Sequence, residues 1–535
     1  MIAGLRNVRS GLLGWVVAHA GIVGLLTATA GGVAPAAKAE TRAPVVRIDT
    51  GALAGIEVPG AFAFLGIPYA GDTGGVNRWK APTPVERWRG TRAATVFGAD
   101  CLQDPPYVPP GGSPWSAAYF PTRSMSEDCL FLNVWTPRLT GRKPVMVWIH
   151  GGGFAGGSAS VPIYDGAKLA ARGIVVVTIN YRVGAFGFLA HPALTAEAGS
   201  SGNYGLMDQI AALRWVKRNI ARFGGDPSAV TIAGQSAGAA SVHALLAAPS
   251  AEGLFHRAIA ESGSGMGSLT DPPPLAVAEA QGVKVAQAAG AIDLASLRSM
   301  PVAAIQRAAN DPSVGPPGIR FRPVTEPRVL PDPHRQRSSV PVLTGLTADE
   351  TSTSPDWHVA DAAGLQVLLE RRFGKSAAVF RRYYGPVHGS DPARAARSLL
   401  REQAIAAMMQ WADRRPRNAA PVFAYLFDHP QDDEVGRRFG SFHTSEVPYV
   451  FATVGTAISR PSLPDRLLSE QISGYWTNFV RTGNPNGGQL PSWPALSSGR
   501  MQRLSDKVEA VEVLAADRLR DYRAFVASGG QLGLF

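Results

Sequence analysis

The chain has 535 residues, of which 45% are hydrophobic and 17% are charged, so it can bury a sizeable core and is not a globally disordered polypeptide. Its net charge of +11 and its isoelectric point near 9.8 are compatible with nucleic acid or an anionic surface as a partner. The basic residues, however, are scattered singly or in pairs with no long Lys/Arg run, so we expect a solvated surface and no nucleic-acid partner.

The first 39 residues have the pattern of an export signal. Arg6 and Arg9 precede an uncharged apolar stretch at 11–30, and the small residues Ala37 and Ala39 on either side of Lys38 provide a cleavage site after Ala39. We therefore expect residues 1–39 to be a signal peptide and residues 40–535 to form one domain. The mature protein is then periplasmic or secreted and not bound to a membrane. An uncleaved membrane anchor is the alternative, because the apolar stretch is somewhat long for a signal.

The only two cysteines, Cys101 and Cys129, agree with export. An even pair in an oxidising compartment indicates a disulfide, and two thiols without nearby histidines make a poor zinc site. We expect no metal.

Short apolar runs rich in β-branched residues predict buried parallel strands at 145–149, 174–179, 230–233, 340–343 and 422–427. Helical patterns lie between them at 206–220 and 275–289. This alternation predicts an α/β fold with a mostly parallel central sheet and helices on both faces. The Pro/Gly-rich segments 104–114 and 311–318 indicate surface loops and not domain boundaries.

Residues 234–238 read Gly-Gln-Ser-Ala-Gly, which matches G-x-S-x-G with Ser236 at its centre. The motif follows a predicted strand and precedes a helical sequence, as expected of the sharp turn that presents a nucleophilic serine. Acyl transfer also needs donors for the developing oxyanion, and the amide of Ala237 is one candidate. The three glycines after His150 form a loop at the end of another predicted strand and can provide the others.

A serine of this kind needs an acid and a histidine later in the chain. Asp349 and Glu350 follow the predicted strand 340–343, and spacing alone does not choose between them. Four histidines come after them; those at positions 358 and 388 lie in helical or loop-like segments, which leaves His429 and His443 as candidates for the base.

Several stretches together resemble the type-B carboxylesterases, which include bacterial para-nitrobenzyl esterases and cholinesterases. They are residues 64–70, 126–135, 150–154, 202–209 and 223–227, and they continue to the serine motif. The resemblance implies the α/β-hydrolase fold and a Ser-His-Glu triad. It selects Glu350 as the acid and His443 as the base, with His429 as the fallback.

The resemblance also implies supporting roles for other residues. It assigns Gly152 and Gly153, together with Ala237, to the oxyanion hole, and the Ser262 hydroxyl to orienting the acid and base. It joins Cys101 to Cys129 around a long loop at the rim of the site. Arg78 and Glu127 resemble a structural ion pair beside that loop.

Departures from the family pattern bear on the substrate. Gln235 replaces the usual Glu before the nucleophile, which removes a buried charge but no catalytic atom. The disulfide loop lacks the pattern that places a cation-binding Trp and is shorter than a fungal lipase lid, so choline esters and long-chain triglycerides are not expected. Phe154 and Leu269 are candidates for the acyl pocket.

These features together predict hydrolysis of small or medium carboxylic esters through an acyl-enzyme, with no cofactor. The alternatives are an amide or carbamate hydrolase, a hydrolase of a specialised toxin or xenobiotic ester, and a non-catalytic binding protein.

Overall fold

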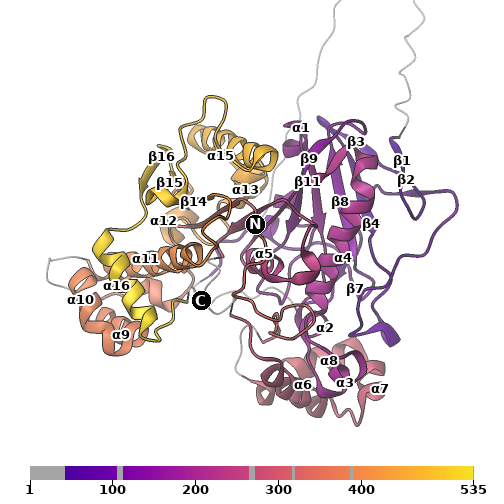
Figure 1. The fold of residues 1–535 in the computed structure, drawn as a ribbon, viewed down its shortest axis with the longest axis horizontal. Helices are drawn as coiled ribbons and strands as arrows, with labels where there is room; N and C mark the ends of the chain where they lie inside the picture. Colours follow the sequence, from indigo (N-terminus) through magenta and orange to yellow (C-terminus); the bar gives the residue numbers. More distant parts are fainter. Residues whose placement is uncertain (1–42, 105–111, 264–270, 316–319, 386–390, 534–535) are drawn as a thin grey trace, which may run out of the picture. The chain divides into compact units, whose positions relative to one another are not determined.

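A mixed sheet of eleven strands organises the protein (Figure 1). The computed structural model describes residues 43–533 except 105–111, 264–270, 316–319 and 386–390; the predicted signal peptide, its cleavage site after Ala39, and Leu269 lie outside these residues. Residues 43–535 form one compact unit.

In spatial order the sheet contains β16 (Glu509–Glu512), β15 (Arg500–Leu504), β14 (Val422–Phe427), β13 (Val342–Thr347), β12 (Arg257–Glu261), β11 (Gly225–Gln235), β9 (Lys143–Ile149), β10 (Val175–Ile179), β8 (Phe131–Thr136), β4 (Ala61–Pro68) and β3 (Ile56–Val58). Every neighbouring pair from β15 to β10 is parallel. The antiparallel pairs lie at the two edges. The sheet is therefore mostly parallel, as expected.

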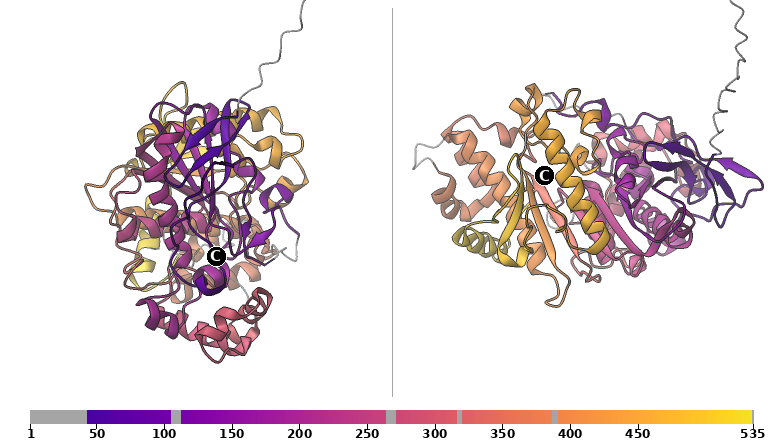
Figure 2. Two further views of the ribbon diagram at one scale, coloured as in Figure 1. Left: turned by 90° about the vertical axis from the view of Figure 1, so that its right-hand side faces the viewer. Right: turned by 90° about the horizontal axis from the view of Figure 1, so that it is seen from above.

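Helices cover both faces of the sheet because its strands are apolar on both faces. Alternate residues of β9 divide between two cores: Val145, Val147 and Ile149 pack with α4 (Tyr204–Asn219) and α5 (Ala237–Ala247). Met146 and Trp148 pack on the other side with α15 (Leu463–Thr482). The long helix α15 crosses the strands in the right-hand view of Figure 2.

Two further helical groups pack beside the sheet (Figure 1). One contains α6 (Leu275–Ala289), α7 (Leu294–Ser299) and α8 (Val302–Ala309), which pack in an apolar cluster that also includes Phe186, Leu189 and Tyr204. The other contains α9 (Ala362–Phe373), α10 (Ala377–Tyr384), α11 (Pro392–Asp413) and the last helix, α16 (Ala516–Ala527), which share the apolar cluster of Phe373 and Phe380.

Several predicted elements have the observed bounds or nearly so: β14 and α6 coincide with the runs at 422–427 and 275–289. The run at 340–343 was expected to be a strand, but β13 begins at Val342. Pro341 explains the difference, because proline has no amide hydrogen to contribute to a strand ladder. None of the described helices combines the length and apolarity that a membrane span requires.

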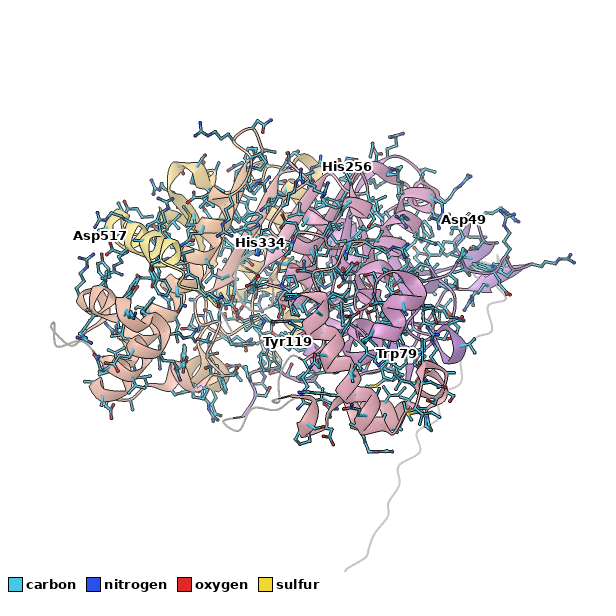
Figure 3. All side chains as sticks on the ribbon, turned by 60° about the horizontal axis from the view of Figure 1, so that its bottom comes forward. Asp49, Trp79, Tyr119, His256, His334 and Asp517 are labelled. Atoms are coloured by element: carbon cyan, nitrogen blue, oxygen red, sulfur yellow. A yellow bond between two sulfur atoms is a disulfide. The ribbon has the colours of Figure 1, made fainter. Side chains whose placement is uncertain are left out.

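Contacts far apart in sequence join the segments around residues 78–129 to the rest of the unit. Cys101 and Cys129 form a disulfide, with Cα atoms 5.0 Å apart. Arg78 makes two contacts of 2.6 Å with the Glu127 carboxylate, as the resemblance implied. The next residue, Trp79 (labelled in Figure 3), is buried, and its indole N–H donates to the Ala185 carbonyl at 2.8 Å.

Candidate active site

Ser236 lies at the turn between β11 and α5, where the sequence predicted it. Its backbone has φ of 59° and ψ of −123°, a region that a residue with a Cβ atom rarely adopts. The turn is possible because its flanking residues are glycines: a Cβ on Gly234 would lie 2.6 Å from the Gly238 backbone, and one on Gly238 would lie 2.0 Å from the Ile149 oxygen. The Ser236 amide donates to the Glu261 carbonyl at 2.9 Å, which fixes the turn on the end of β12.

His443 and Glu350 are brought together from segments 93 residues apart. The His443 Nδ1 atom is hydrogen-bonded to Glu350 Oε2, and the Thr347 amide donates to Glu350 Oε1 at 2.7 Å. Burial works to raise the pKa of Glu350, but the charge and hydrogen bond of His443, with a further hydrogen bond from Ser262, hold that pKa below its usual value. Glu350 is therefore ionised at neutral pH and can stabilise a positive imidazole ring.

The pKa of His443 moves in the opposite direction. Burial works to lower it, but the Glu350 carboxylate outweighs burial and raises the pKa above 6.5. Two further contacts fix the histidine: Gln235 Nε2 lies 3.2 Å from His443 Nε2, and the Trp115 indole N–H donates to the His443 carbonyl at 3.0 Å. The sequence placed Trp115 only in the disulfide loop and did not reveal that it supports this histidine.

The glycine loop after β9 lies against the serine. A Cβ on Gly151 would come within 3.1 Å of Ser236 Cβ. Gly152 has φ of 110° and Gly153 has φ of 63°, both in the left-handed region. Among the described residues, the amides of Gly152, Gly153 and Ala237 have no hydrogen-bond partner, so these donors are available to a ligand beside Ser236.

The side chains on either side of this loop are buried. His150 is buried, stacks on Tyr181 with a ring separation of 4.3 Å, and has its pKa lowered to about 4 by burial. It is therefore neutral at neutral pH and a weak base, and its Nδ1 atom lies 2.8 Å from the Gly151 carbonyl oxygen. Phe154, a candidate for the acyl pocket, is completely buried and packs edge-on against Phe188 at 5.2 Å.

The two rejected alternatives for acid and base have other partners. Asp349 accepts hydrogen bonds from the Ser441 amide at 3.0 Å and the Trp357 indole at 3.3 Å, so it supports the segment before His443. His429 lies between Asp506 and Asp465, at 2.7 Å and 2.9 Å, in a separate cluster.

A layer of buried acidic groups under the site is the feature that sequence reasoning missed. Ser262 Oγ lies 3.1 Å from Glu446 Oε1, and the Trp476 indole donates to Glu261 Oε1 at 2.7 Å. Both glutamates are buried, at 1% and 0% exposure. The local sequence has no clear signal for their burial, because each glutamate stands at the end of a short apolar element. Glu261 ends the strand Arg257–Glu261, and Glu446 precedes the helix Val447–Val450.

The 202–209 stretch holds the scaffold of the site through buried polar contacts. Asp208 Oδ1 and Oδ2 accept from the Arg182 guanidinium at 2.7 Å and 2.8 Å, and both side chains are almost fully buried. Gln209 Nε2 donates to Ser241 Oγ on α5 at 3.0 Å. These contacts connect α4 to the helix that begins at Ser236.

Comparisons with known proteins agree with this geometry. The profile of the Carboxylesterase family matches residues 42–519. The chain is 36% identical to the para-nitrobenzyl esterase of Bacillus subtilis, in an alignment that covers 84% of this chain and 92% of the relative. It is 35% identical to the fumonisin B1 esterase of Sphingopyxis macrogoltabida, in an alignment that covers 88% of this chain and 87% of that relative. The solved structure of a thermophilic PNB esterase superposes with a TM-score of 0.74 at 32% identity, covering 89% of this chain and 99% of that one.

Proposed function

The chain belongs to the carboxylesterase family and is an ester hydrolase with the α/β-hydrolase fold, and from this premise we propose that Ser236, His443 and Glu350 are its catalytic triad. The observation that carries the proposal is the hydrogen bond between His443 Nδ1 and an ionised Glu350, together with the 3.2 Å contact of His443 Nε2 with Gln235. Gln235 directly precedes the serine that is held in a strained strand-to-helix turn. Such an arrangement leaves Nε2 of the neutral ring as the proton acceptor.

The two halves of the reaction use the same groups. His443 takes the Ser236 hydroxyl proton while Oγ forms a bond to the ester carbonyl carbon, and the carbonyl electrons move onto oxygen. The carbon–oxygen ester bond then breaks, and the alcohol leaves with the proton from His443. Water attacks the acyl-enzyme by the same route, which releases the acid and restores Ser236.

We assign the oxyanion hole to the amides of Gly152, Gly153 and Ala237. The assignment is supported by the contact of the glycine loop with Ser236 and by the lack of a partner for these amides among the described residues. Such donors act without reorganisation in a site that excludes water, and losing one typically costs about 10²–10³ in kcat.

We propose small or medium carboxylic esters as substrates, with Phe154 and Leu269 beside the acyl group. The test measures hydrolysis of p-nitrophenyl esters from acetyl to palmitoyl by the mature protein and by Ser236→Ala. The proposal expects a maximum at short or medium chains and loss of turnover in the variant. A maximum at palmitoyl contradicts the substrate class, and turnover that survives in Ser236→Ala contradicts the nucleophile.

The same panel, extended to p-nitroanilides and aryl carbamates, separates the two hydrolase alternatives. A higher kcat/KM on those substrates than on every ester would favour amide or carbamate hydrolysis by the same triad. A folded protein that turns over none of these substrates would favour the hypothesis that it hydrolyses a specialised toxin or xenobiotic ester. If a fluorophosphonate also failed to label Ser236, the hypothesis of a non-catalytic binding protein would be favoured.

We also propose that residues 1–39 are an export signal and that the Cys101–Cys129 disulfide forms after export. Arg6, Arg9 and the apolar stretch support the signal, and the 5.0 Å separation of the cysteine Cα atoms supports the bridge. N-terminal sequencing of the exported protein should begin at Glu40. A cytoplasmic protein that retains Met1 and two free thiols would contradict both.

A further inference from the structure

Three buried glutamates meet beneath the site from different parts of the fold. Glu350 follows β13, Glu261 ends β12, and Glu446 precedes α13 (Val447–Val450); they are 5%, 0% and 1% exposed. Three ionised carboxylates in one buried space would repel one another without compensation. Glu350 has the partners of an ionised carboxylate, so the other two are the candidates for carrying a proton.

The Ser262 hydroxyl lies between Glu446 and Glu350, and its single proton limits which of the two it can donate to. Its oxygen lies 3.1 Å from Glu446 Oε1, and it is also hydrogen-bonded to Glu350. A serine hydroxyl has one proton to donate and lone pairs that accept, so it cannot donate to two carboxylates at once. Both contacts are satisfied only if Ser262 donates to Glu350 and accepts a proton from Glu446.

The second oxygen of Glu446 agrees with a neutral carboxyl group. Glu446 Oε2 is buried and has no hydrogen-bond partner among the described residues. A carboxylate oxygen left in that state is costly, whereas a carbonyl oxygen of a neutral acid tolerates it better. Burial, with the charges of Glu261 and Glu350, raises the pKa of Glu446 to about 8.

We propose that Glu446 is protonated at neutral pH and donates to Ser262, which in turn donates to Glu350. Glu446 is then a positioning residue that acts on the triad through Ser262 and touches no substrate. The inference rests on the roles proposed above for Ser236, Glu350 and His443.

Among the residues that the structure describes, His443, on the same segment as Glu446, is the cation that favours the ionised form of Glu446. The groups that face it from other elements are acids or phenols: Glu261 of β12, Glu350 after β13, Tyr425 of β14, Tyr119 of η2 (Ala117–Tyr119) and Tyr164 of η3 (Pro162–Tyr164). Tyr119, labelled in Figure 3, and Tyr164 are buried phenols that stay neutral, because burial raises the pKa of each well above 10.

The proton on Glu446 has a pH-dependent consequence. Below its raised pKa the chain Glu446–Ser262–Glu350 is intact. Above that pKa the ionised Glu446 competes for the single Ser262 proton, Glu350 loses a donor, and a second negative charge faces His443. We therefore expect kcat to fall on the alkaline side, with a midpoint near the pKa of Glu446.

The first experiment compares pH profiles of kcat and kcat/KM for the wild-type enzyme, Glu446→Gln and Glu446→Ala. Glu446→Ala should lower kcat about tenfold with little change in KM, because the acid is less well oriented. Glutamine keeps an N–H donor for Ser262 and has no charge to gain, so it should restore most of kcat and remove the alkaline fall. The acid limb of Glu446→Gln should stay within about 0.3 pH units of wild type.

An ionised Glu446 predicts a different result. Removing a negative charge beside His443 would then lower the midpoint of the acid limb by about one unit or more. That shift, or an alkaline fall that survives in Glu446→Gln, overturns the proposal. If esterase activity instead survives in Ser236→Ala, the proposed triad fails and not only this inference.

Infrared difference spectroscopy tests the proton directly and needs no turnover. The wild-type protein at neutral pH should show carbonyl absorption of buried protonated carboxylic acids, and Glu446→Gln should lose the Glu446 contribution. The contribution of Glu261, whose pKa burial also raises to about 8, should remain in that variant. Glu261→Gln is the matched control, because it replaces a neighbouring buried glutamate without touching Ser262 and should keep the Glu446 band. A spectrum unchanged by Glu446→Gln overturns the proposal even if the alanine variant does not fold.

Discussion

Replacing Gln235 by Glu would place a carboxylate next to His443. The Gln235 Nε2 atom lies 3.2 Å from His443 Nε2, and Gln235 is only 2% exposed. At an effective dielectric constant of about 20, unit charges at that distance attract by about 5 kcal/mol. Burial of the new carboxylate opposes part of this, so we expect the pKa of His443 to rise by about 1–3 units.

The expected consequence is a shift of the acid limb of kcat/KM. His443 accepts a proton only when neutral, so activity is lost as pH falls through its pKa. The wild-type midpoint should lie above 6.5, since Glu350 already outweighs burial in setting that pKa. In Gln235→Glu the midpoint should rise further, and kcat/KM at about pH 7 should fall about tenfold while the alkaline value is kept.

Stopped-flow or steady-state hydrolysis of p-nitrophenyl butyrate across pH provides the assay. Gln235→Met is the control, because it removes the amide without adding a charge and should move the midpoint much less. An unshifted acid limb in a folded Gln235→Glu, still labelled by a fluorophosphonate, would refute the electrostatic reasoning about His443.

Three further predictions concern stability. Asp208→Ala removes the two carboxylate oxygens that accept from the buried Arg182 guanidinium. Urea unfolding should therefore show that the free energy of unfolding falls by about 3–5 kcal/mol, and a fall of less than about 1 kcal/mol would contradict this. Replacing Cys101 and Cys129 together by Ser opens a loop with a sequence separation of 28 and should cost about 3–4 kcal/mol, whereas unchanged unfolding would argue against the disulfide. Asp465 and Asp506 raise the pKa of His429 although burial works to lower it. The free energy of folding that this protonated histidine contributes is therefore fully present below the unfolded pKa of 6.5 and is lost as pH rises through the folded pKa. His429→Asn should lower the melting temperature more at about pH 6 than at about pH 9, and equal losses would contradict this.

Local sequence patterns predicted the elements that are uniformly apolar. The run at 422–427 consists of apolar and aromatic residues, and it forms β14 with the same bounds. The sheet strands β3, β4, β8, β12, β15 and β16 were not predicted. β12 begins with Arg257 and ends with Glu261, and charged residues at its ends mask a buried strand whose carboxylate is held by a distant Trp476.

Some residues of the site can be identified from local sequence and others only from contacts between distant segments. The serine turn is a local feature, since glycines on both sides of Ser236 are required by the close approach of backbones there. The choice of Glu350 over Asp349 is not local: the two are neighbours, and only the packing of His443 against one of them separates their roles. Spacing could therefore propose both residues, and only the family pattern or the fold could choose.

The protonation of the buried layer was least accessible to sequence reasoning. Whether Glu446 is neutral depends on its distance from Ser262, on Glu261 from another strand and on the absence of a partner for Oε2 in the described residues. None of these contacts is within the same segment of the chain, except that Glu446 is three residues after His443.

The central claim is that Ser236 is the nucleophile, and active-site titration tests it most directly. The protein is titrated with a fluorophosphonate while hydrolysis of p-nitrophenyl butyrate is followed, and the adduct is located by peptide mass spectrometry. The account predicts one adduct per chain, on Ser236, with activity lost in proportion and no adduct in Ser236→Ala. An adduct on another residue, or full inactivation without modification of Ser236, would contradict it.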